Sequence, residues 1–370
     1  MKNLGFGLMR LPLTNPQDVS SIDMSKLCEM ADYFLERGYT YFDTAYMYHG
    51  GKSESAVQEA LTRRHKRENF FLTSKLPVFY LTQKGDQERI FEEQRKRCGV
   101  DYFDNYLLHS LNKSNFETAE KHNSFGYVEK LKREGKVRHI GFSFHDTAEV
   151  LESILCAHPE MEFVQLQINY LDWEDARVQS HKCYDVAVKH GKKIIVMEPV
   201  KGGTLANPPQ AAQDLLRKCH PDWSPASWAL RFAASLPNVV TVLSGMSNMQ
   251  QLSENTSFMG THIEFGDHER SVIETVIAIL NGKKAIPCTA CRYCTETCPK
   301  NIAIPEYFSL YNETLSKGNF DDGRIAYKKF LVNFGAAADC LHCKKCERVC
   351  PQHLPVTEHL KKIDEIFGGH

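Results

Sequence analysis

Two copies of one cysteine pattern constrain the fold of this 370-residue chain more than any other feature of its sequence. Eight of the thirteen cysteines follow the spacing Cys-x2-Cys-x2-Cys-x3-Cys-Pro, once from Cys288 to Pro299 and again from Cys340 to Pro351. Three thiolates at this spacing can wrap three irons of a cubane, and the fourth ligand must approach from elsewhere. The pattern is therefore typical of segments that bind [4Fe–4S] clusters.

The repeat predicts two [4Fe–4S] clusters, because in two-cluster ferredoxins the fourth cysteine of each motif serves the other cluster. One cluster would be held by Cys288, Cys291, Cys294 and Cys350. The second would be held by Cys340, Cys343, Cys346 and Cys298. Zinc also uses Cys-x2-Cys pairs. Zinc binding, however, would not explain why a third cysteine and a Cys-Pro step occur in both copies at the same spacing.

The composition is that of an ordinary globular protein, with 42% hydrophobic and 25% charged residues. The formal net charge of -1 gives no reason to expect nucleic acid or an anionic membrane surface as a partner. No apolar run approaches the roughly 18 residues that a membrane span requires. A cysteine cluster binds metal rather than forming disulfides in a reducing compartment. We therefore expect a cytoplasmic protein without a membrane partner.

The first 280 residues alternate short β-like runs with longer amphipathic helical stretches. The β-like runs are Leu4–Met9, Thr40–Asp43, Phe70–Ser74, Tyr102–Leu108, His139–Phe142, Phe163–Gln167, Ile194–Glu198 and Val239–Leu243. Helical periodicity marks segments such as Met24–Arg37, Glu54–Arg64, Gly126–Glu134, Ala176–His190 and Ser224–Leu236. Eight βα units of this length predict an α/β fold, a (β/α)8 TIM barrel. A doubly wound sheet is the alternative, but its Gly-x-Gly-x-x-Gly turn after the first strand is missing.

A small polar break, residues 282–287, precedes the first cysteine motif and predicts a domain boundary. The barrel would then span residues 1–282 and a second domain residues 283–370. Helical character between the motifs, over Ile304–Leu315 and Gly323–Phe334, joins them into one module. We therefore expect the barrel to be followed by a small, mainly α-helical ferredoxin-like domain.

Four polar residues follow the predicted strands at the end where active sites of such barrels are built. Asp43, Lys75 and His109 come just past strand ends, and Tyr48 lies in the loop after one. In the scheme that they suggest, Tyr48 protonates a carbonyl oxygen as hydride reaches the carbon. Lys75 would lower the phenol pKa, Asp43 would hold Lys75, and His109 would orient the substrate oxygen.

The first domain resembles the aldo-keto reductases from Gly5 to Asn255, nearly the whole barrel. The motifs that carry the resemblance are 5–10 (Gly-Phe-Gly-Leu-Met-Arg), 43–48 (Asp-Thr-Ala-x-x-Tyr), 74–75, 108–109, 140–144, 164–167 and 198–203. The resemblance implies a barrel that binds NADPH (or NADH) in an extended pose and reduces a small-molecule carbonyl substrate. The C-terminal module resembles the α-helical ferredoxin domains of some bacterial and archaeal members.

The resemblance also implies the cofactor contacts. Ser143 and Gln165 would hold the nicotinamide carboxamide, and Met197 stands where many members stack an aromatic ring. The residues that would cradle the pyrophosphate are Val200, Lys201, Gly202 and Gly203. Those that would border the adenosine are Gln251, Glu254 and Asn255. The stretch 244–251, where NADPH-selective members usually offer Lys or Arg, contains no cation, so NADPH and NADH both stay open.

Three functions remain open at this stage. The first is an NAD(P)H-dependent carbonyl reductase whose clusters exchange electrons with a carrier such as a ferredoxin or flavodoxin. Lys344 and Lys345, inside the second motif, could dock an acidic carrier or be ordinary surface charge. Nicotinamide gives two electrons as hydride and each cluster takes one, so a flavin intermediary is possible. The second function is therefore a ferredoxin-linked flavin electron-transfer protein that reuses the barrel. The third is a redox-sensing regulatory subunit, which the intact set of four polar residues disfavours.

Overall fold

In a computed structural model, residues 3–260, 265–282 and 285–368 are described, and the chain forms two compact units. The first unit comprises Met1–Val200 and Ala226–Arg270, and the second comprises Lys201–Pro225 and Ser271–His370. Lys283 and Lys284 of the predicted boundary lie outside the described residues. The division at residue 282 therefore stays a prediction. In the described part of the chain, no helix is both long and apolar enough to cross a membrane.

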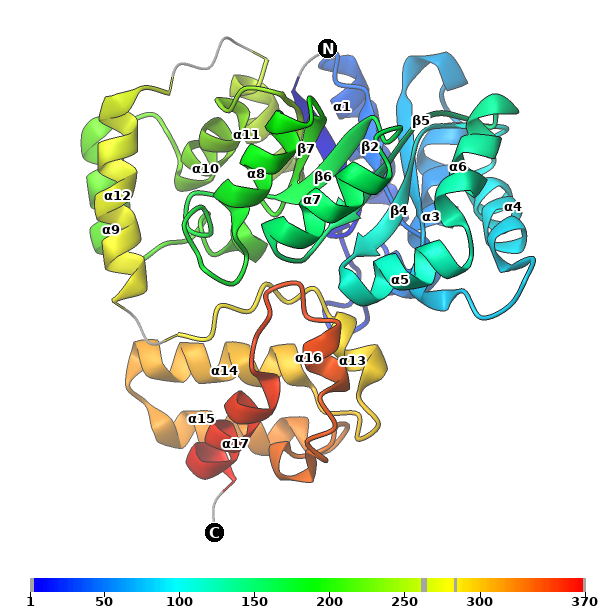
Figure 1. The fold of residues 1–370 in the computed structure, drawn as a ribbon. Coiled ribbons are helices and arrows are strands. Elements are labelled where there is room, and N and C mark those ends of the chain that lie inside the picture. Colours follow the sequence, from blue (N-terminus) through cyan, green and yellow to red (C-terminus); the bar gives the residue numbers. More distant parts are fainter. Residues whose placement is uncertain (1–2, 261–264, 283–284, 369–370) are drawn as a thin grey trace. The chain divides into compact units, whose positions relative to one another are not determined.

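Eight parallel strands close into a barrel in sequence order, with β8 pairing β1 (Figure 1). The strands are β1 Leu4–Gly7, β2 Tyr41–Asp43, β3 Phe71–Leu76, β4 Phe103–Leu111, β5 Val137–Phe144, β6 Phe163–Gln167, β7 Lys193–Met197 and β8 Val239–Ser244. The predicted (β/α)8 barrel is thus confirmed. Each predicted β-like run coincides with one of these strands to within a few residues.

Strands β3 and β4 extend past their predicted ends, and this changes where two polar residues lie. Strand β3 continues to Leu76, so Lys75 lies inside it, paired with Leu107 of β4. Strand β4 continues to Leu111, so His109 lies inside it, where the register with β5 shifts. The backbone pairing continues past the hydrophobic run because parallel ladder bonds do not depend on which side chains the strand carries.

The helices that follow the strands are α1 Met24–Glu36, α2 Tyr48–Gly51, α3 Ser53–Val57, α4 Asp86–Cys98, α5 Lys113–Lys121, α6 Ser124–Arg133, α7 Ala148–Ala157, α8 Ser180–Lys189, α9 Gln210–Cys219, α10 Pro225–Ala234, α11 Met249–Phe258 and α12 Asp267–Asn281. The predicted helix Glu54–Arg64 consists of α3 and a π-helical turn over Gln58–Thr62. The helix predicted over Ala176–His190 begins only at Ser180.

Side chains that alternate along the strands build the barrel interior in layers. An apolar cluster contains Tyr41, Leu107, Phe163, Ile195 and Leu243. Asp43 follows Tyr41 by two residues on β2, and His109 follows Leu107 by two on β4. Alternation therefore turns these two polar side chains to the same side of their strands as the apolar cluster. The sequence spacing alone places them inside the barrel.

The cysteine module in the second unit is mainly helical, as predicted. Its helices are α13 Tyr293–Thr297, α14 Ile304–Lys317, α15 Phe320–Phe330, α16 Lys345–Arg348 and α17 Val356–Phe367. Large aromatic and aliphatic side chains form its core, among them Tyr307, Tyr311, Tyr327, Ile363 and Phe367. The helices predicted over Ile304–Leu315 and Gly323–Phe334 correspond to α14 and α15. The module therefore has a hydrophobic core of its own beside the cysteine segments.

One glycine of the barrel wall gives a test of the packing. An ideal Cβ on Gly141 of β5 would lie 2.4 Å from the carbonyl oxygen of Phe163 and 2.8 Å from its ring. The backbone of β6 cannot yield cheaply, because Gly141 pairs with Phe163 in the sheet. Gly141→Ala should therefore lower the free energy of unfolding by about 1–3 kcal/mol, the usual cost of overpacking.

The measurement is the thermal midpoint by far-UV circular dichroism under anaerobic conditions. Gly266→Ala is the matched control, since the nearest atom to a Cβ there is the Glu269 carboxylate at 3.4 Å and the site is exposed. Equal midpoints for the two variants would show that the barrel wall at Gly141 is less tightly packed than the structure indicates.

Candidate functional site

A buried lysine forms the centre of the candidate site in the barrel. The Lys75 ammonium donates to the Asp43 carboxylate at 2.5 Å, to the Thr44 carbonyl at 2.8 Å and to the Tyr48 hydroxyl at 3.3 Å. An ammonium has three N–H groups, so these acceptors use all of them. The lysine is 1% exposed. Its head is therefore fixed in one orientation, with Asp43 and Tyr48 beside it.

Burial acts against both charges of the Lys75–Asp43 pair. Burial lowers the pKa of Lys75, and the negative charge of Asp43 opposes that effect. Burial likewise raises the pKa of Asp43, and the positive charge of Lys75 opposes it. Removing one member of such a pair is costly because it leaves the other charge buried without compensation. Asp43 is thus the residue that keeps an ammonium at this depth.

Tyr48 is positioned by a tight turn. It begins α2, and the next two residues, His49 and Gly50, have φ of 56° and 60°. The His49 ring anchors the turn, because its Nε2 accepts from the Leu11 amide at 3.2 Å and its Nδ1 donates to the Val19 carbonyl at 2.6 Å. Burial lowers the pKa of His49, which agrees with a neutral ring in this arrangement. The turn therefore holds the Tyr48 phenol in the loop after β2, although α2 is only one turn long.

His109 lies next to Tyr48, with the two ring centroids 6.1 Å apart in an edge-on contact. Burial holds the pKa of His109 well below its usual range, and the charge of Lys75 lowers it further. The imidazole is therefore neutral at physiological pH. The ring of Phe79, 5.7 Å from His109, completes this side of the site. Sequence reasoning missed Phe79, although it stands in the loop directly after β3.

A second polar layer supports the strand that carries Lys75. The side-chain amide nitrogen of Gln94 in α4 lies 3.0 Å from the Lys75 carbonyl, 2.9 Å from the Ser74 hydroxyl and 2.7 Å from the buried Glu54 carboxylate, and its two hydrogens serve two of these acceptors at a time. The Tyr106 hydroxyl donates to the Gln94 side-chain oxygen at 2.6 Å. Buried polar networks of this kind rigidify a core when their members are satisfied. Gln94 was not predicted, because a glutamine in a charged helix carries no local signal of burial.

The residues predicted to hold the nicotinamide carboxamide lie on neighbouring strands. Ser143 of β5 is buried, and its hydroxyl accepts from the Ser110 amide at 2.7 Å. Gln165 of β6 pairs with Ser143 in the sheet and is 2% exposed. Among the described residues, the Gln165 side-chain oxygen has no hydrogen-bond partner. A buried amide oxygen of this kind fits a ligand N–H group. Met197, half-buried, ends β7.

The residues predicted to border the adenosine lie on α11. The Gln251 side-chain oxygen accepts from the Ser247 amide at 2.8 Å, and the Asn255 amide donates to the Ser244 hydroxyl at 3.2 Å. Glu254, one turn after Gln251, is partly buried. The structure thus ties Asn255 to the last residue of β8 and Gln251 to the loop that follows it, both in the stretch 244–251 that contains no cation.

An arginine from another loop lies against this cation-free stretch. The backbone oxygen of Arg10 accepts from the Ser247 hydroxyl at 2.9 Å, and its side chain lies 3.0 Å from an ideal Cβ on Gly245. The Arg10 guanidinium is also paired with Glu198 at 3.4 Å. Arg10 comes from the segment after β1, far away in the sequence. Sequence reasoning named it only as part of a motif and gave it no role.

The predicted pyrophosphate residues divide between the two units. Val200 ends one part of the first unit, whereas Lys201, Gly202 and Gly203 begin one part of the second. The last three have φ of 47°, 62° and 98°, so the chain turns sharply here. Two glycines in succession make that turn inexpensive.

The four cysteines predicted for one cluster, called group I (Cys288, Cys291, Cys294 and Cys350), lie near one another. Burial raises the pKa of Cys294, and the sulfurs of Cys291, Cys288 and Cys350, followed by that of Cys346, add to the rise. A buried thiol among other thiols becomes a thiolate only when a cation offsets the charge. The donor set therefore fits a thiolate-ligated metal cluster.

The other four, called group II (Cys298, Cys340, Cys343 and Cys346), line one hollow of about 320 Å³, open solvent included. Burial raises the pKa of Cys346 to about 11, and Cys340 contributes to the rise. The hollow joins Cys298 of the first motif to three cysteines of the second. Such an arrangement fits a cluster, and crossed ligation of two clusters stays a prediction.

The two motif copies also have the same backbone conformation at matched positions. Residues at the same three positions of each copy have left-handed φ, namely Ala290 and His342, Arg292 and Lys344, and Asn301 and His353. Non-glycine residues rarely adopt this conformation, which costs free energy at each site. Six such residues in matched positions indicate that both segments are shaped for the same purpose, the presentation of thiols.

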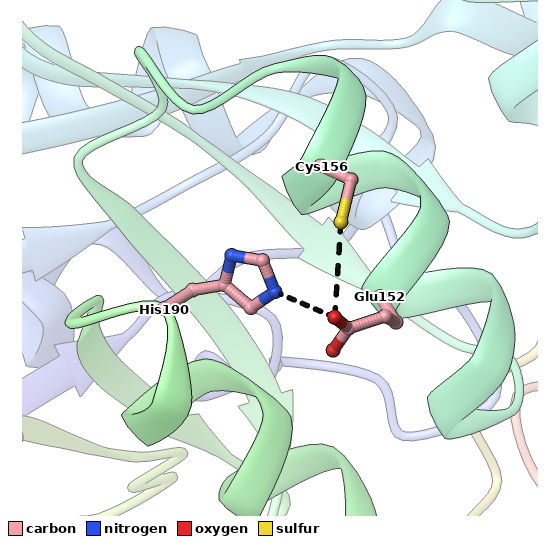
Figure 2. Close-up of side chains that lie close together, drawn as sticks. All are labelled: Glu152, Cys156 and His190. Carbon is pink, nitrogen blue, oxygen red and sulfur yellow. Dashed lines mark hydrogen bonds and ion pairs between the residues drawn. The ribbon is translucent and has the colours of Figure 1, made fainter.

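A separate polar cluster lies between α7 and α8 (Figure 2). Glu152, Cys156 and His190 have ligand atoms within 4.8 Å of one another. A single carboxylate oxygen of Glu152 lies 3.1 Å from His190 Nε2 and 2.8 Å from the Lys189 ammonium. A metal ion would have to displace that ammonium, so we interpret the cluster as an ion-pair network between two helices.

Residues 3–277 match the model of the aldo/keto reductase family, and residues 287–354 match that of a 4Fe-4S dicluster domain. Aldo-keto reductase str7 of Strobilurus tenacellus is 27% identical over 224 residues, which cover 58% of this chain and 62% of that protein. Methylglyoxal reductase YeaE of Escherichia coli (strain K12) is 39% identical over 120 residues, 32% of this chain and 39% of that protein.

A solved structure extends the likeness to the whole barrel. The aldo-keto reductase from Klebsiella pneumoniae in complex with NADPH superimposes with a TM-score of 0.58 at 18% identity, covering 74% of this chain and 90% of that one. At this identity the likeness shows the fold. The family match itself covers well over half of the chain. The chain thus belongs to the aldo/keto reductase family and carries a 4Fe-4S dicluster domain after its barrel.

Proposed function

We propose that this protein reduces an aldehyde or ketone with NADPH in its barrel and carries electrons through two [4Fe–4S] clusters in its second domain. The observation that carries the first part is the Lys75 ammonium, which bonds both Asp43 and Tyr48 beside a neutral His109. The match to a methylglyoxal reductase supports a carbonyl substrate.

Tyr48 is the proposed proton donor. When bound, NADPH would supply the hydride to the carbonyl carbon. The Tyr48 hydroxyl gives its proton to the carbonyl oxygen, which completes the alcohol. The phenolate left behind faces the Lys75 ammonium at 3.3 Å, so its charge is stabilised in a buried site. Solvent later returns the proton to Tyr48.

His109 is proposed to orient the substrate oxygen. Because burial holds its pKa well below the usual range, the ring is neutral and can donate one N–H to that oxygen. A protonated ring would compete with Lys75 for the role of the local cation. The neighbouring Phe79 ring gives the substrate an apolar wall. Together they favour a small carbonyl compound with an apolar group next to the carbonyl.

The dinucleotide is proposed to be NADPH rather than NADH. The Gln165 oxygen suits the amide N–H of a carboxamide, and a structure of the same fold is an NADPH complex. The missing cation near the adenosine is supplied by Arg10, whose backbone is fixed by Ser247 and whose side chain packs on Gly245. A guanidinium binds phosphate strongly and in fixed geometry.

Two clusters are proposed because each cysteine group offers four thiols. Group II is the more accessible, since Cys343 is exposed and Leu341 beside it is 59% exposed. Lys300, Lys344 and Lys345 line the hollow of group II. An exposed apolar side chain among cations fits an acidic one-electron carrier such as a ferredoxin.

A flavin in the barrel stays the alternative to nicotinamide. An absorbance spectrum of the protein with bleached clusters distinguishes the two, because a bound flavin would keep its yellow absorption band.

Tyr48→Phe tests the proton donor. The variant keeps the ring but lacks the proton, so carbonyl reduction should fall by at least about a hundredfold, the usual contribution of a general acid. Binding of NADPH, followed by quenching of tryptophan fluorescence, should be nearly unchanged. Tyr46→Phe is the control, because that hydroxyl bonds Glu93 instead. Parent-like turnover in Tyr48→Phe would remove Tyr48 from the mechanism.

Arg10→Gln tests the cofactor preference. Loss of a charge-assisted bond to the 2′-phosphate should raise the dissociation constant of NADPH roughly tenfold or more and leave that of NADH almost unchanged. The control is Arg63→Gln, which removes an exposed arginine paired with Glu59 on the same helical segment. Equal losses for both dinucleotides would mean that Arg10 does not contact the 2′-phosphate.

The double variant Lys344→Glu/Lys345→Glu tests the carrier surface. With an acidic two-cluster ferredoxin as the probe, the rate of electron exchange at low salt should fall about tenfold, and added salt should narrow the difference. Lys328→Glu/Lys329→Glu reverses two exposed charges on α15 and is the matched control. If both double variants slow the exchange equally, net charge matters and the group II surface does not.

A further inference from the structure

The segment after β7 is structurally part of the cysteine module. Residues Lys201–Pro225 fall in the same compact unit as Ser271–His370, whereas the strand that precedes them belongs to the other unit. In the proposed function this segment begins with the pyrophosphate-binding residues, Lys201 to Gly203. Its neighbours in the module therefore help to decide whether those residues can bind a dinucleotide.

A buried hydrogen bond joins this segment to the end of the second cysteine motif. The Lys201 ammonium donates to the Gln352 side-chain oxygen at 3.2 Å. Both residues are nearly inaccessible, at 4% and 3% exposed. A lysine side chain is a flexible four-carbon stem, so its position is defined only when the ammonium is hydrogen-bonded. Gln352 thus fixes the place of a cation in a segment proposed to meet phosphates.

A backbone contact joins the same segment to the start of the first motif. An ideal Cβ on Gly202 would lie 2.7 Å from both the Cα and the carbonyl oxygen of Thr289. Gly202 also has φ of 62°, which favours glycine on its own account. Thr289 is 3% exposed. The segment therefore lies directly on the backbone of Thr289, with no room for a side chain between them.

The two contacts lead to the same cysteine group. Thr289 directly follows Cys288, and Gln352 comes two residues after Cys350. Both cysteines belong to group I, although they lie in different motifs. The contacts that hold the segment thus come from two chain segments that one cluster would tie together.

We propose that Thr289 and Gln352 are positioning residues for the dinucleotide, and that occupancy of the dinucleotide site and the state of the group I cluster are coupled through them. The inference rests on the proposed NADPH site. Coupling of this kind is reciprocal, so a change at the cluster that alters dinucleotide affinity implies an equal effect of the dinucleotide on the cluster.

The first test replaces Gln352 in the cluster-loaded protein. Gln352→Leu should raise the dissociation constant of NADPH about three- to tenfold, the effect expected of one lost hydrogen bond. Gln352→Glu, which keeps an acceptor for Lys201, should restore the affinity. Iron content and the visible spectrum confirm that both variants hold their clusters. Unchanged affinity in loaded Gln352→Leu overturns the inference, whereas failure of the parent to bind NADPH overturns the proposed function instead.

The second test starts from the other side of the contact and does not touch the cysteine segments. Lys201→Met should change the visible circular dichroism, or the electron paramagnetic resonance signal, of one reduced cluster in the absence of NADPH. Lys192→Met is the matched control, because Lys192 is also buried and donates to a backbone carbonyl, that of Pro159, at 2.7 Å. Identical cluster signals in Lys201→Met and the parent overturn the coupling.

A pair of adjacent glycines completes the design. Gly202→Ala should shift the same cluster signal, because the new Cβ must displace Thr289. Gly203→Ala imposes a comparable backbone strain at φ of 98° but meets no atom within 4 Å. Its cluster signal should match that of the parent. Equal shifts in both variants would assign the effect to the strained turn and overturn the role of Thr289.

Discussion

A buried ammonium is the interaction on which the barrel site depends. Lys75 has lost its water, and its three donors are taken by one carboxylate, one carbonyl and one phenol. A different local structure positions each acceptor. Alternation along β2 turns Asp43 inward, and the Thr44 carbonyl lies just after the strand end. A turn anchored by His49 places Tyr48. Because a buried charge is costly without its partners, the loss of any one acceptor would destabilise the Lys75 ammonium and with it the whole site.

The cysteine module is held by a different physical principle. Its aromatic core packs as in any small helical domain, but its cysteine segments contain six left-handed residues that are not glycine. Buried thiols with raised pKa values, such as Cys294 and Cys346, do not favour such a fold by themselves. Metal–thiolate bonds are strong enough to offset both costs. On this account the barrel folds by burial, whereas the cysteine segments need their metal.

The sequence was sufficient for whatever depends on local periodicity or fixed spacing. Eight hydrophobic runs predicted the strands, and the repeated cysteines predicted the crossed grouping that Cys298 and the hollow of group II agree with. The sequence was insufficient where a residue acts across a long separation. Gln94 and Arg10 gain their places only when the barrel closes, and no local pattern distinguishes them from ordinary surface residues.

The contact between Lys201 and Gln352, 151 residues apart, bears on how hydride chemistry and one-electron carriers share a chain. A nicotinamide transfers two electrons together and a cluster transfers one, so direct exchange between them requires an intermediary. Coupling through binding requires none. If the segment that meets the pyrophosphate is fixed by the segments that ligate a cluster, the state of the cluster sets dinucleotide affinity without any electron passing between them. On the proposed function, the fusion of barrel and module then couples dinucleotide binding to the cluster, in addition to any electrons that the clusters exchange with a carrier.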